Sequence, residues 1–217
     1  MIALQLPAAA AANVPVDVLG GLTLIALAPF VIVMMTSFVR IVVVLSLVRS
    51  ALGTQSLPPS PVITGLALVL TFVVMTPTLQ RISHDALAPY EGGRIDQRTM
   101  IARGVEPLRA FMLRQTAKAD ATFFSRIAQR GNAAIEEAPL TVVIPAFVVG
   151  ELRRGFSIGF MLYLPFIAID LVVSATLMGL GMFMLSPSVV SLPCKLYLFV
   201  MVDGWTAVCG TIANSFR

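Results

Sequence analysis

Charged residues are nearly confined to one third of this 217-residue chain, and this distribution limits the possible folds more than any other feature. Of the 26 Lys, Arg, Asp and Glu residues, 19 lie between Arg81 and Arg154, and the 143 residues outside that segment carry only seven. Hydrophobic residues make up 58% of the chain and charged residues 12%, against about 45–50% and about 25% in soluble domains. The composition excludes a disordered chain, a collagen-like chain and an ordinary cytosolic enzyme, and predicts a protein surrounded mainly by lipid or by other apolar helices.

Two apolar blocks flank the charged segment, and both predict helices. Their apolar runs exceed the usual length of a strand and do not alternate with period two. In the first block, the loop-forming run Gly53–Pro61 separates Leu22–Val48, long enough to span a bilayer, from Val62–Leu79, which is at the lower limit for a span. The first block therefore predicts a helical hairpin.

The second apolar block predicts another hairpin, with a turn at Ser186-Pro187-Ser188 between Phe156–Leu185 and Val189–Ala213. Pro165 and Pro193 would kink these helices, because proline removes a backbone donor. The expected fold is an all-α membrane protein in which two long apolar hairpins flank a polar, amphipathic helical segment. Its parts are an N-terminal segment (1–20), a first hairpin (21–80), the polar segment (81–154) and a second hairpin (155–217).

The N-terminal stretch Met1–Val16 is rich in alanine and lacks the basic n-region, the h-region and the cleavage pattern of a signal peptide. Two expectations follow. Either the chain inserts by its first hydrophobic helix, or translation starts upstream of residue 1.

The polar segment contains two amphipathic patterns. In the first, residues 107–115, Leu108, Phe111 and Met112 share one face, and Pro107 suits a first helical position. This pattern predicts a short helix with one apolar stripe.

The second pattern predicts a helix over residues 119–130, with Phe123, Phe124 and Ile127 apolar and Gly131 as a left-handed C-cap. The two helices would pack on each other, on a hairpin or on a neighbouring subunit. A local helical hairpin is the simplest interpretation.

Four charged residues interrupt apolar sequence: Arg40, Asp170, Lys195 and Asp203. A charge at mid-bilayer depth costs roughly 3 kcal/mol on insertion scales, so these residues need partners or water. They could line an ion or substrate path, pair between helices or subunits, or reach the membrane interface from a helix end. The last interpretation suits Arg40, whereas pairing suits Asp170 and Lys195, which lie on adjacent helices of one hairpin.

Signatures of catalysis, metal binding and nucleic-acid binding are missing from the sequence. The single histidine, His84, has only Asp85 beside it, and no nucleophile elbow, Walker sequence or dinucleotide-binding fingerprint occurs. Cys194 and Cys209 lie in apolar sequence and are interpreted as small buried residues. Basic and acidic residues alternate, so the net charge of +4 forms no basic stripe. We therefore expect no enzyme, no cofactor, no metal and no nucleic-acid partner.

Methionine is frequent, with 11 residues, and Met182-Phe183-Met184 lie just before the Ser186-Pro187-Ser188 turn of the second hairpin. One interpretation is a flexible helix end that packs in lipid or in the core. The other is a soft constriction, because methionine is unbranched and adapts to irregular shapes.

Several long, ordered motifs resemble the FliP family of the type III secretion export apparatus, and they cover nearly everything from about residue 20 onward. These motifs are Met34–Ile41, Leu47–Thr54, Pro58-Pro59, Phe111–Thr116, Pro145–Phe147, Glu151-Leu152, Gly155–Phe160, Pro165–Ile167, Asp170–Val172 and Asp203–Trp205. The flagellar branch is more similar than the injectisome branch, which typically has Thr-Ser-Tyr-Thr-Lys in place of Thr36–Arg40.

The resemblance implies a pore-forming subunit of the flagellar protein export gate. It implies that five copies assemble with the membrane proteins FliQ and FliR into a ring in the bacterial inner membrane, in the flagellar basal body. The ring would enclose the channel for unfolded flagellar proteins and would be bounded by lipid and partner subunits. The polar segment would lie on the periplasmic side. Flagellar members usually carry a cleaved signal sequence, which favours an upstream start here.

The resemblance also implies roles for particular residues. Met182, Phe183 and Met184 stand where the family has three methionines that seal the pore, and Phe183 replaces the central one. Glu151, Asp170 and Lys195 resemble the family's buried charged set, which ties neighbouring subunits together. Other departures from the family pattern are Gly150, Ser157 and Cys194.

Other functions remain alternatives to this one. The chain could be an injectisome export subunit, or a small-solute or ion transporter with Asp170 and Lys195 in the path. Such a transporter would usually show inverted repeats, and the sequence has no evident repeat beyond the two hairpins.

Overall fold

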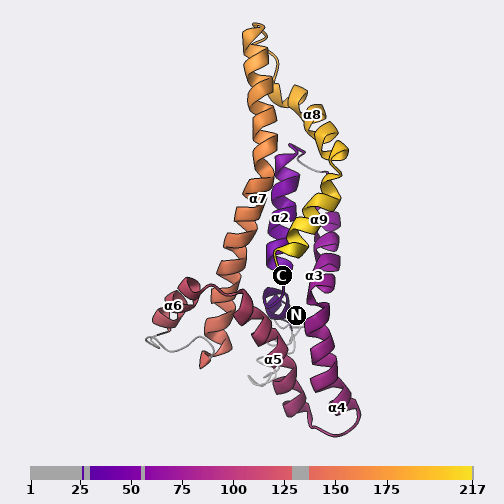
Figure 1. Cartoon of the computed structure of the whole chain (residues 1–217), viewed down its shortest axis with the longest axis vertical. Helices are drawn as coiled ribbons and strands as arrows, with labels where there is room; N and C mark the ends of the chain where they lie inside the picture. The colour runs from indigo at the N-terminus through magenta and orange to yellow at the C-terminus, as the bar shows by residue number, and fades with distance from the viewer. Residues whose placement is uncertain (1–25, 27–29, 55–56, 129–136, 217) are drawn as a thin grey trace, which may run out of the picture. The chain divides into compact units, whose positions relative to one another are not determined.

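A computed structural model describes residues 26, 30–54, 57–128 and 137–216. Within these it contains nine helical elements with defined bounds and no strand, and residues 30–34 are also helical. Residues 1–32 and 33–217 form two compact units, and all nine elements belong to the second. They are α2 Phe38–Ala51, α3 Ser60–Ile82, the π-helical turn η1 Ser83–Leu87, α4 Ala88–Glu91, α5 Gln97–Gln115, α6 Lys118–Ile127, α7 Leu140–Gly179, α8 Pro187–Met201 and α9 Gly204–Asn214 (Figure 1). This architecture confirms the predicted all-α class.

Among the described residues, two continuous helical stretches are long and apolar enough to cross a membrane. One is Ser60–Glu91, formed by α3, η1 and α4, and the other is α7. The pair α8 and α9 passes the same test only as a bent unit, with an angle of 66° between its two parts. The bend lies between the two helices at Asp203, which has a left-handed conformation (φ 48°). The sharp break therefore lies at Asp203 and not at Pro193, which is inside α8.

The first predicted span, Leu22–Val48, is not one helix in its described part. Helix α2 begins only at Phe38, after a turn in which the Thr36 hydroxyl donates to the Val33 carbonyl oxygen at 2.8 Å and accepts from the Phe38 N–H at 3.3 Å. Its 14 residues measure about 21 Å, short of a bilayer core of about 30 Å. Residues 22–25 and 27–29, and the N-terminal stretch 1–16, lie outside the described residues.

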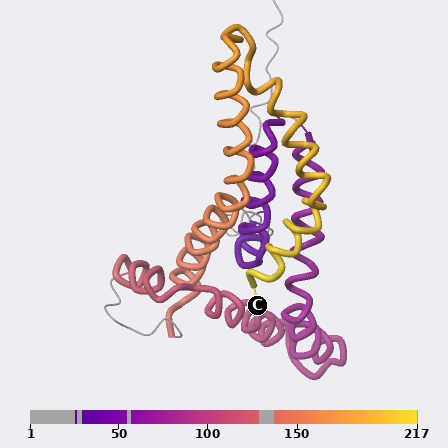
Figure 2. The backbone as a smooth tube through the Cα atoms, turned by 45° about the horizontal axis from the view of Figure 1, so that its top comes forward, coloured from indigo at the N-terminus to yellow at the C-terminus, as the bar shows by residue number. Residues whose placement is uncertain are grey.

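Helix α2 packs along α7, as Figures 1 and 2 both show. Gly155 and Gly159 of α7 permit this approach: a Cβ at Gly155 would lie 3.2 Å from Val43, and one at Gly159 would overlap Leu47. Glycines four residues apart let two helix backbones come close, as in membrane helix pairs. The two glycines therefore set how closely α2 and α7 approach each other.

Two apolar clusters hold the helices together. The first joins α2 and α3 to α7, α8 and α9 through the buried residues Ile41, Val44, Leu45, Val48, Ala51, Leu52, Ile63, Ala67, Phe166, Phe199, Val208 and Ile212. The second joins the turn that precedes α2 to α3, α5 and α7 through Met35, Met75, Phe111, Met112, Ala138, Val142, Val143 and Phe147. Phe216 packs against both clusters.

The two amphipathic helices predicted within the polar segment are present as α5 and α6, but their limits differ from those predicted. Helix α5 begins at Gln97 because Asp96 caps it, accepting a hydrogen bond from the Thr99 N–H at 3.3 Å. Pro107 therefore lies inside the helix and not at its first position. Hydrogen bonding by Thr99 also lowers the pKa of the Asp96 carboxyl.

Helix α6 ends at Ile127, with Ala128 as its C-cap, and so stops before the predicted limit at residue 130. The proposed C-cap Gly131 lies outside the described residues. Phe124 packs on the second apolar cluster, as do Leu108, Phe111 and Met112 of α5. Phe123 and Ile127 are exposed, so only part of the predicted apolar surface is covered within one chain.

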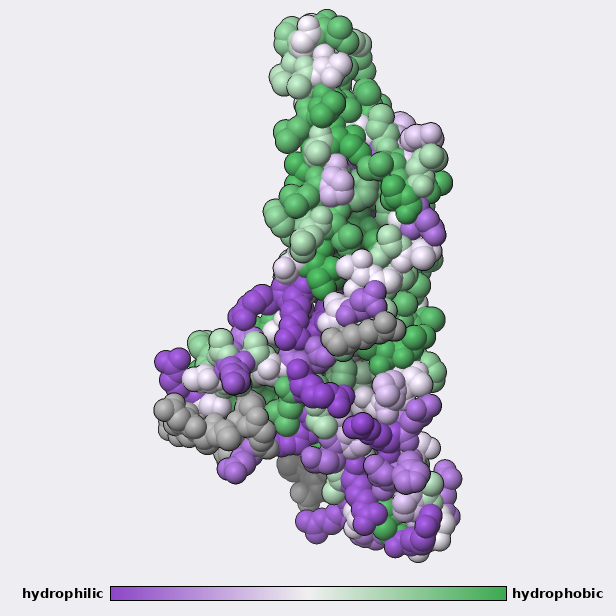
Figure 3. Space-filling model, in the orientation of Figure 1, coloured by the Kyte–Doolittle hydropathy of each residue, from purple (hydrophilic) through white to green (hydrophobic). Residues whose placement is uncertain are grey.

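Large apolar side chains cover the outside of the second half of α7 and of α8, whereas polar side chains gather over α4 and α5 (Figure 3). The exposed large apolar residues of α7 are Val149, Phe156, Phe160, Met161, Leu164, Leu171, Val172 and Met178. A soluble monomer rarely exposes so large a continuous apolar surface. Lipid or further protein subunits are therefore the expected surroundings of these helices.

Candidate functional site

A charged cluster lies at the centre of the fold, around Arg40 of α2. Arg40 and Glu151 of α7 are both 0% exposed. The Arg40 Nε donates to Glu151 Oε2 at 2.9 Å, and Nη2 donates to Glu151 Oε1 at 2.5 Å. This two-pronged geometry is the strongest form of an Arg–carboxylate contact. Arg40 therefore pairs with Glu151 and does not reach the membrane interface from a helix end.

The remaining Arg40 donors also have partners. Nη1 donates to the backbone oxygen and to Oγ of Ser215, at 2.7 and 2.9 Å, and Nη2 donates to Gln115 Oε1 at 3.1 Å. The guanidinium carbon lies 3.8 Å from the centre of the Phe216 ring. The cluster thus binds α2, α5 and α7 to the residues after α9 through one side chain.

A second arginine adds to this cluster from its rim. Arg154 Nη1 donates to Gln115 Oε1 at 2.7 Å and lies 3.8 Å from Glu151 Oε1. The cluster therefore contains two positive charges and one negative charge. Glu151 is the only anion among these contacts. Removing Glu151 would leave two unbalanced positive charges, whereas removing either arginine would leave one charge of each sign.

Helix α6 is attached to α7 by a separate ion pair. Arg153 contacts Asp120 through two nitrogens, at 2.7 and 3.0 Å, and Asp120 is buried. A Cβ at Gly150 would meet the Asp120 carboxylate at 3.4 Å, so the glycine leaves room for this oxygen. Gly150, one of the departures from the family pattern, thus lies where α6 docks.

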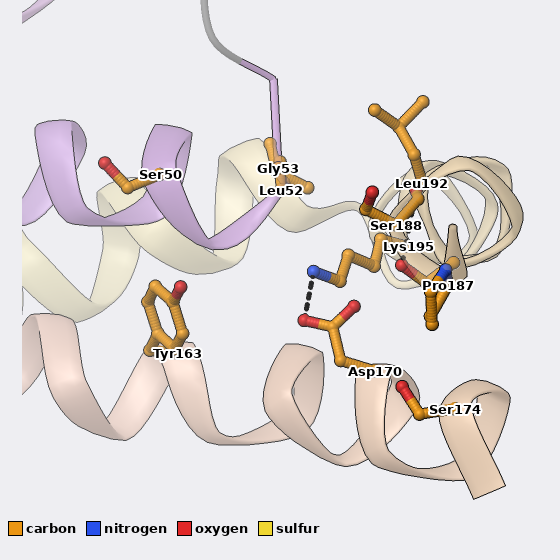
Figure 4. Close-up of a pocket in the computed structure, with 11 residues that line it drawn as sticks. Ser50, Leu52, Gly53, Tyr163, Asp170, Ser174, Pro187, Ser188, Leu192 and Lys195 are labelled. Carbon is orange, nitrogen blue, oxygen red and sulfur yellow. Dashed lines mark hydrogen bonds and ion pairs between the residues drawn. The ribbon is translucent and has the colours of Figure 1, made fainter. Parts of the chain in front are cut away.

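Asp170 of α7 and Lys195 of α8 form an ion pair between the two helices of the second hairpin. Lys195 Nζ donates to Asp170 Oδ2 at 2.6 Å. Figure 4 shows the two side chains pointing toward one another, and both line a cavity of about 320 Å³. Hydroxyl groups of Tyr163, Ser174 and other serines line this cavity. Lys195 is buried, whereas the Asp170 side chain is 42% exposed, so one carboxylate edge stays open to a further donor or to water.

The residues predicted to form a gate lie at the tip of the second hairpin. Helix α7 ends there with two bonds: the Met182 N–H donates to the Leu177 carbonyl at 2.9 Å, and the Gly181 N–H donates to the Met178 carbonyl at 3.1 Å. These bonds and the positive φ of Gly181 (73°) form a Schellman motif. Gly181 therefore sets the turn that presents the tip.

The three tip side chains are 41%, 78% and 102% exposed at Met182, Phe183 and Met184, respectively. No apolar cluster of the described chain contains them. The tip therefore has free apolar side chains, which is the arrangement that a contact with other copies, with partners or with lipid requires.

Comparison with known proteins identifies the family of this chain. The model of the FliP family matches residues 21–212. The chain belongs to the FliP family. It is 49% identical over 196 residues to the flagellar biosynthetic protein FliP of Pectobacterium carotovorum subsp. carotovorum. The aligned region covers 90% of this chain and 76% of that relative.

Other FliP-family relatives show similar identities. The chain is 43% identical to FliP of Bacillus subtilis (strain 168), with 90% of the chain and 89% of the relative covered. It is 45% identical to FliP of Buchnera aphidicola subsp. Baizongia pistaciae (strain Bp), with 94% of the chain covered but only 57% of that longer relative. The family resemblance predicted from the motifs is thus confirmed.

The structure brings together some predicted site residues and separates others. Asp170 and Lys195 contact each other, whereas Glu151 belongs to the cluster of Arg40, and the tip residues are apart from both groups. The role of these residues between subunits stays a prediction. The partners Gln115 and Ser215 were missed, because a neutral side chain in a mixed sequence gives no signal of burial beside a charge.

His84 and the two cysteines are the other residues considered for chemistry in the sequence. His84 is exposed and contacts Asp85 at 2.7 Å, and the described residues contain no group of three metal-ligating side chains. Cys194 and Cys209 are free thiols. Cys194 is exposed on α8, so its interpretation as a buried residue is wrong for the isolated chain.

Proposed function

We propose that this chain is a pore-forming subunit of the flagellar type III protein export gate in the bacterial inner membrane. Membership of the FliP family establishes a role in flagellar biosynthesis and export. The pore-forming role is supported chiefly by one observation: an exposed apolar tip of two methionines and a phenylalanine on an apolar hairpin.

In this proposal, five copies bring their tips together around a central channel, with FliQ and FliR completing the assembly. The fifteen apolar side chains exclude water and ions by dewetting when the channel is closed. They separate for an unfolded flagellar protein without specific contacts, because methionine side chains adapt to irregular shapes. Polar side chains at the same place would hold water and leak.

Phe183 gives the seal a stiffer middle than three methionines would give. Its ring has two rotatable side-chain bonds and a large apolar area, so it fills space well but adapts less. The Schellman turn at Gly181 supplies a fixed base for this ring. The seal of this chain would therefore depend more on the position of the tip and less on side-chain rearrangement.

The test replaces Met182, Phe183 and Met184 together with Ala and measures ion conductance and entry of small molecules in cells that still assemble the complex. A matched control replaces Leu171 and Val172, which are equally apolar and exposed on α7, with Ala. Increased permeability in the tip variant alone supports the proposal. An assembled complex with unchanged permeability would place the seal elsewhere.

A second candidate function is a path for ions or small solutes, and the hydroxyl-lined cavity at Asp170 and Lys195 favours it. The two candidates differ in what a Lys195 variant does. A structural ion pair predicts poorer assembly, whereas a path predicts normal assembly with altered transport.

A further inference from the structure

Helix α9 is held at its two ends by quite different contacts. At its start, the chain turns through 66° at Val202–Asp203, and Asp203 has a positive φ that L side chains rarely adopt. At its end, Ser215 and Phe216 reach the buried charged cluster.

The start of α9 is a tightly packed corner. A Cβ at Gly204 would overlap the Phe199 ring, so this ring rests directly on the backbone of α9. Phe199 also makes an edge-on contact with Trp205, with ring centres 5.2 Å apart. The corner is thus a defined pivot between α8 and α9.

Behind the corner, the packing is incomplete. A cavity of about 290 Å³ lies between α9 and its neighbours and is lined by apolar residues of α2, α7, α8 and α9, among them Val48, Phe166, Leu198 and Ala207. Val208 of α9 lines this cavity and belongs to the first apolar cluster, and Ile212 is the other residue of α9 in that cluster. The missing contacts reduce the resistance of α9 to movement about its pivot.

The far end of α9 is held by a small number of directed contacts. Ser215 accepts from Arg40 with its backbone oxygen and its hydroxyl, and Phe216 accepts from Gln115 Nε2 at 3.3 Å through its backbone oxygen. The Phe216 ring stacks on Phe111 and lies over the Arg40 guanidinium. These contacts act as a latch, because all of them are lost at once if the end of α9 moves away.

We propose that α9 is a strap that pivots at Asp203 and is latched by Ser215 and Phe216 onto the Arg40 cluster. The latched state covers the apolar cavity and completes the donors of Arg40. The released state opens the cavity and leaves Arg40 with its contacts to Glu151 and Gln115 only. This inference does not depend on the proposed export function, because it concerns contacts within one chain.

Cys209, which is partly buried on α9, reports the position of the strap. In a Cys194→Ser background it is the only cysteine of the chain, and its labelling by N-ethylmaleimide is followed by mass spectrometry in detergent-purified protein. We expect Phe216→Ala to increase the labelling rate roughly fivefold, because it removes a cation–ring contact of a desolvated arginine. Asp203→Ala should also increase it roughly fivefold, since alanine tolerates a left-handed conformation less well than aspartate does.

Two further variants make the test specific. Asp203→Gly should label no faster than the parent, because glycine adopts a positive φ without strain. Thr211→Ala is the matched control on the outer face of α9, since the Thr211 hydroxyl donates only to the Ala207 carbonyl of the same helix among the bonds described. It should label at the parent rate.

Equal labelling of Phe216→Ala, Asp203→Ala and the parent would overturn the proposal, as would faster labelling of Thr211→Ala. If Phe216→Ala loses its helical circular dichroism, Ser215→Gly and Asp203→Ala decide the question. Faster labelling of these two in a folded protein supports the strap, and unchanged labelling of both refutes it.

Discussion

Replacing Glu151 with leucine should destabilise the chain more than any other single change in the charged cluster, and a second change at Arg40 should restore part of the loss. Glu151→Leu removes both acceptors of a two-pronged contact and leaves Arg40, which is 0% exposed, without its carboxylate. Breaking a buried ion pair by removing one partner costs about 3–5 kcal/mol. Arg154 makes this variant worse, because it adds a second positive charge nearby.

The double variant Arg40→Met with Glu151→Leu removes the buried charge together with its partner. Apolar replacement of a buried pair is often nearly neutral, and methionine can still pack on the Phe216 ring. The contacts of Arg40 with Ser215 are lost as well, so we do not expect full recovery. The double variant should be about 2 kcal/mol more stable than Glu151→Leu alone.

The measurement is the free energy of unfolding of the detergent-purified chain, followed by circular dichroism in a denaturant titration. Phe160→Leu, an exposed change on the same helix, is the control and should change stability by less than about 0.5 kcal/mol. A double variant that is no more stable than Glu151→Leu would refute the argument from charge balance.

Three further predictions concern other parts of the chain. Lys195→Met should lower the yield of the assembled complex in a size-exclusion assay, because it leaves a carboxylate unpaired; normal assembly with lost export would indicate a path role instead. Phe124→Asp should destabilise the chain by about 2 kcal/mol or more in the same titration, because it places a charge against an apolar cluster, whereas Phe123→Asp, at an exposed position, should change it little; equal effects would contradict the assigned faces. Asp96→Ala should lower stability near neutral pH and have no effect in strong acid, since the Asp96 pKa is lowered on folding. The stabilising contribution of Asp96 is present above the unfolded pKa of about 4 and is lost as the pH falls through the folded pKa. A constant difference in stability across the pH range would show that the carboxylate charge does not contribute to stability.

The apolar blocks and the polar segment could be predicted because they depend on composition over long windows. Helix limits were less predictable. Pro107 suggested a helix start, but the Asp96 cap and the apolar face of α5 extend the helix through it. At the break before Phe38, the hydroxyl of Thr36 donates to the Val33 carbonyl and accepts from the Phe38 N–H. The apolar residues around Thr36 gave no sign of this local bonding.

The charged cluster was predictable in part. An isolated arginine in apolar sequence demands a partner on energetic grounds, and the pairing of Asp170 with Lys195 follows from their places on adjacent helices. The partner of Arg40 could not be chosen in the same way, because Glu151 is 111 residues away along the chain. Gln115 and Ser215, the other hydrogen-bond partners of Arg40, are brought to it by tertiary packing that no local sequence pattern encodes.

The length of α7 has a mechanical consequence. From Glu151 in the charged cluster to Gly179 below the tip, the helix rises about 42 Å at 1.5 Å per residue. A rotation of about 5° around the cluster would therefore displace the tip by roughly 3–4 Å, a distance comparable to the thickness of an aromatic ring. The length of the helix would therefore magnify a small rotation near the buried ion pair into a larger displacement of the tip at Phe183.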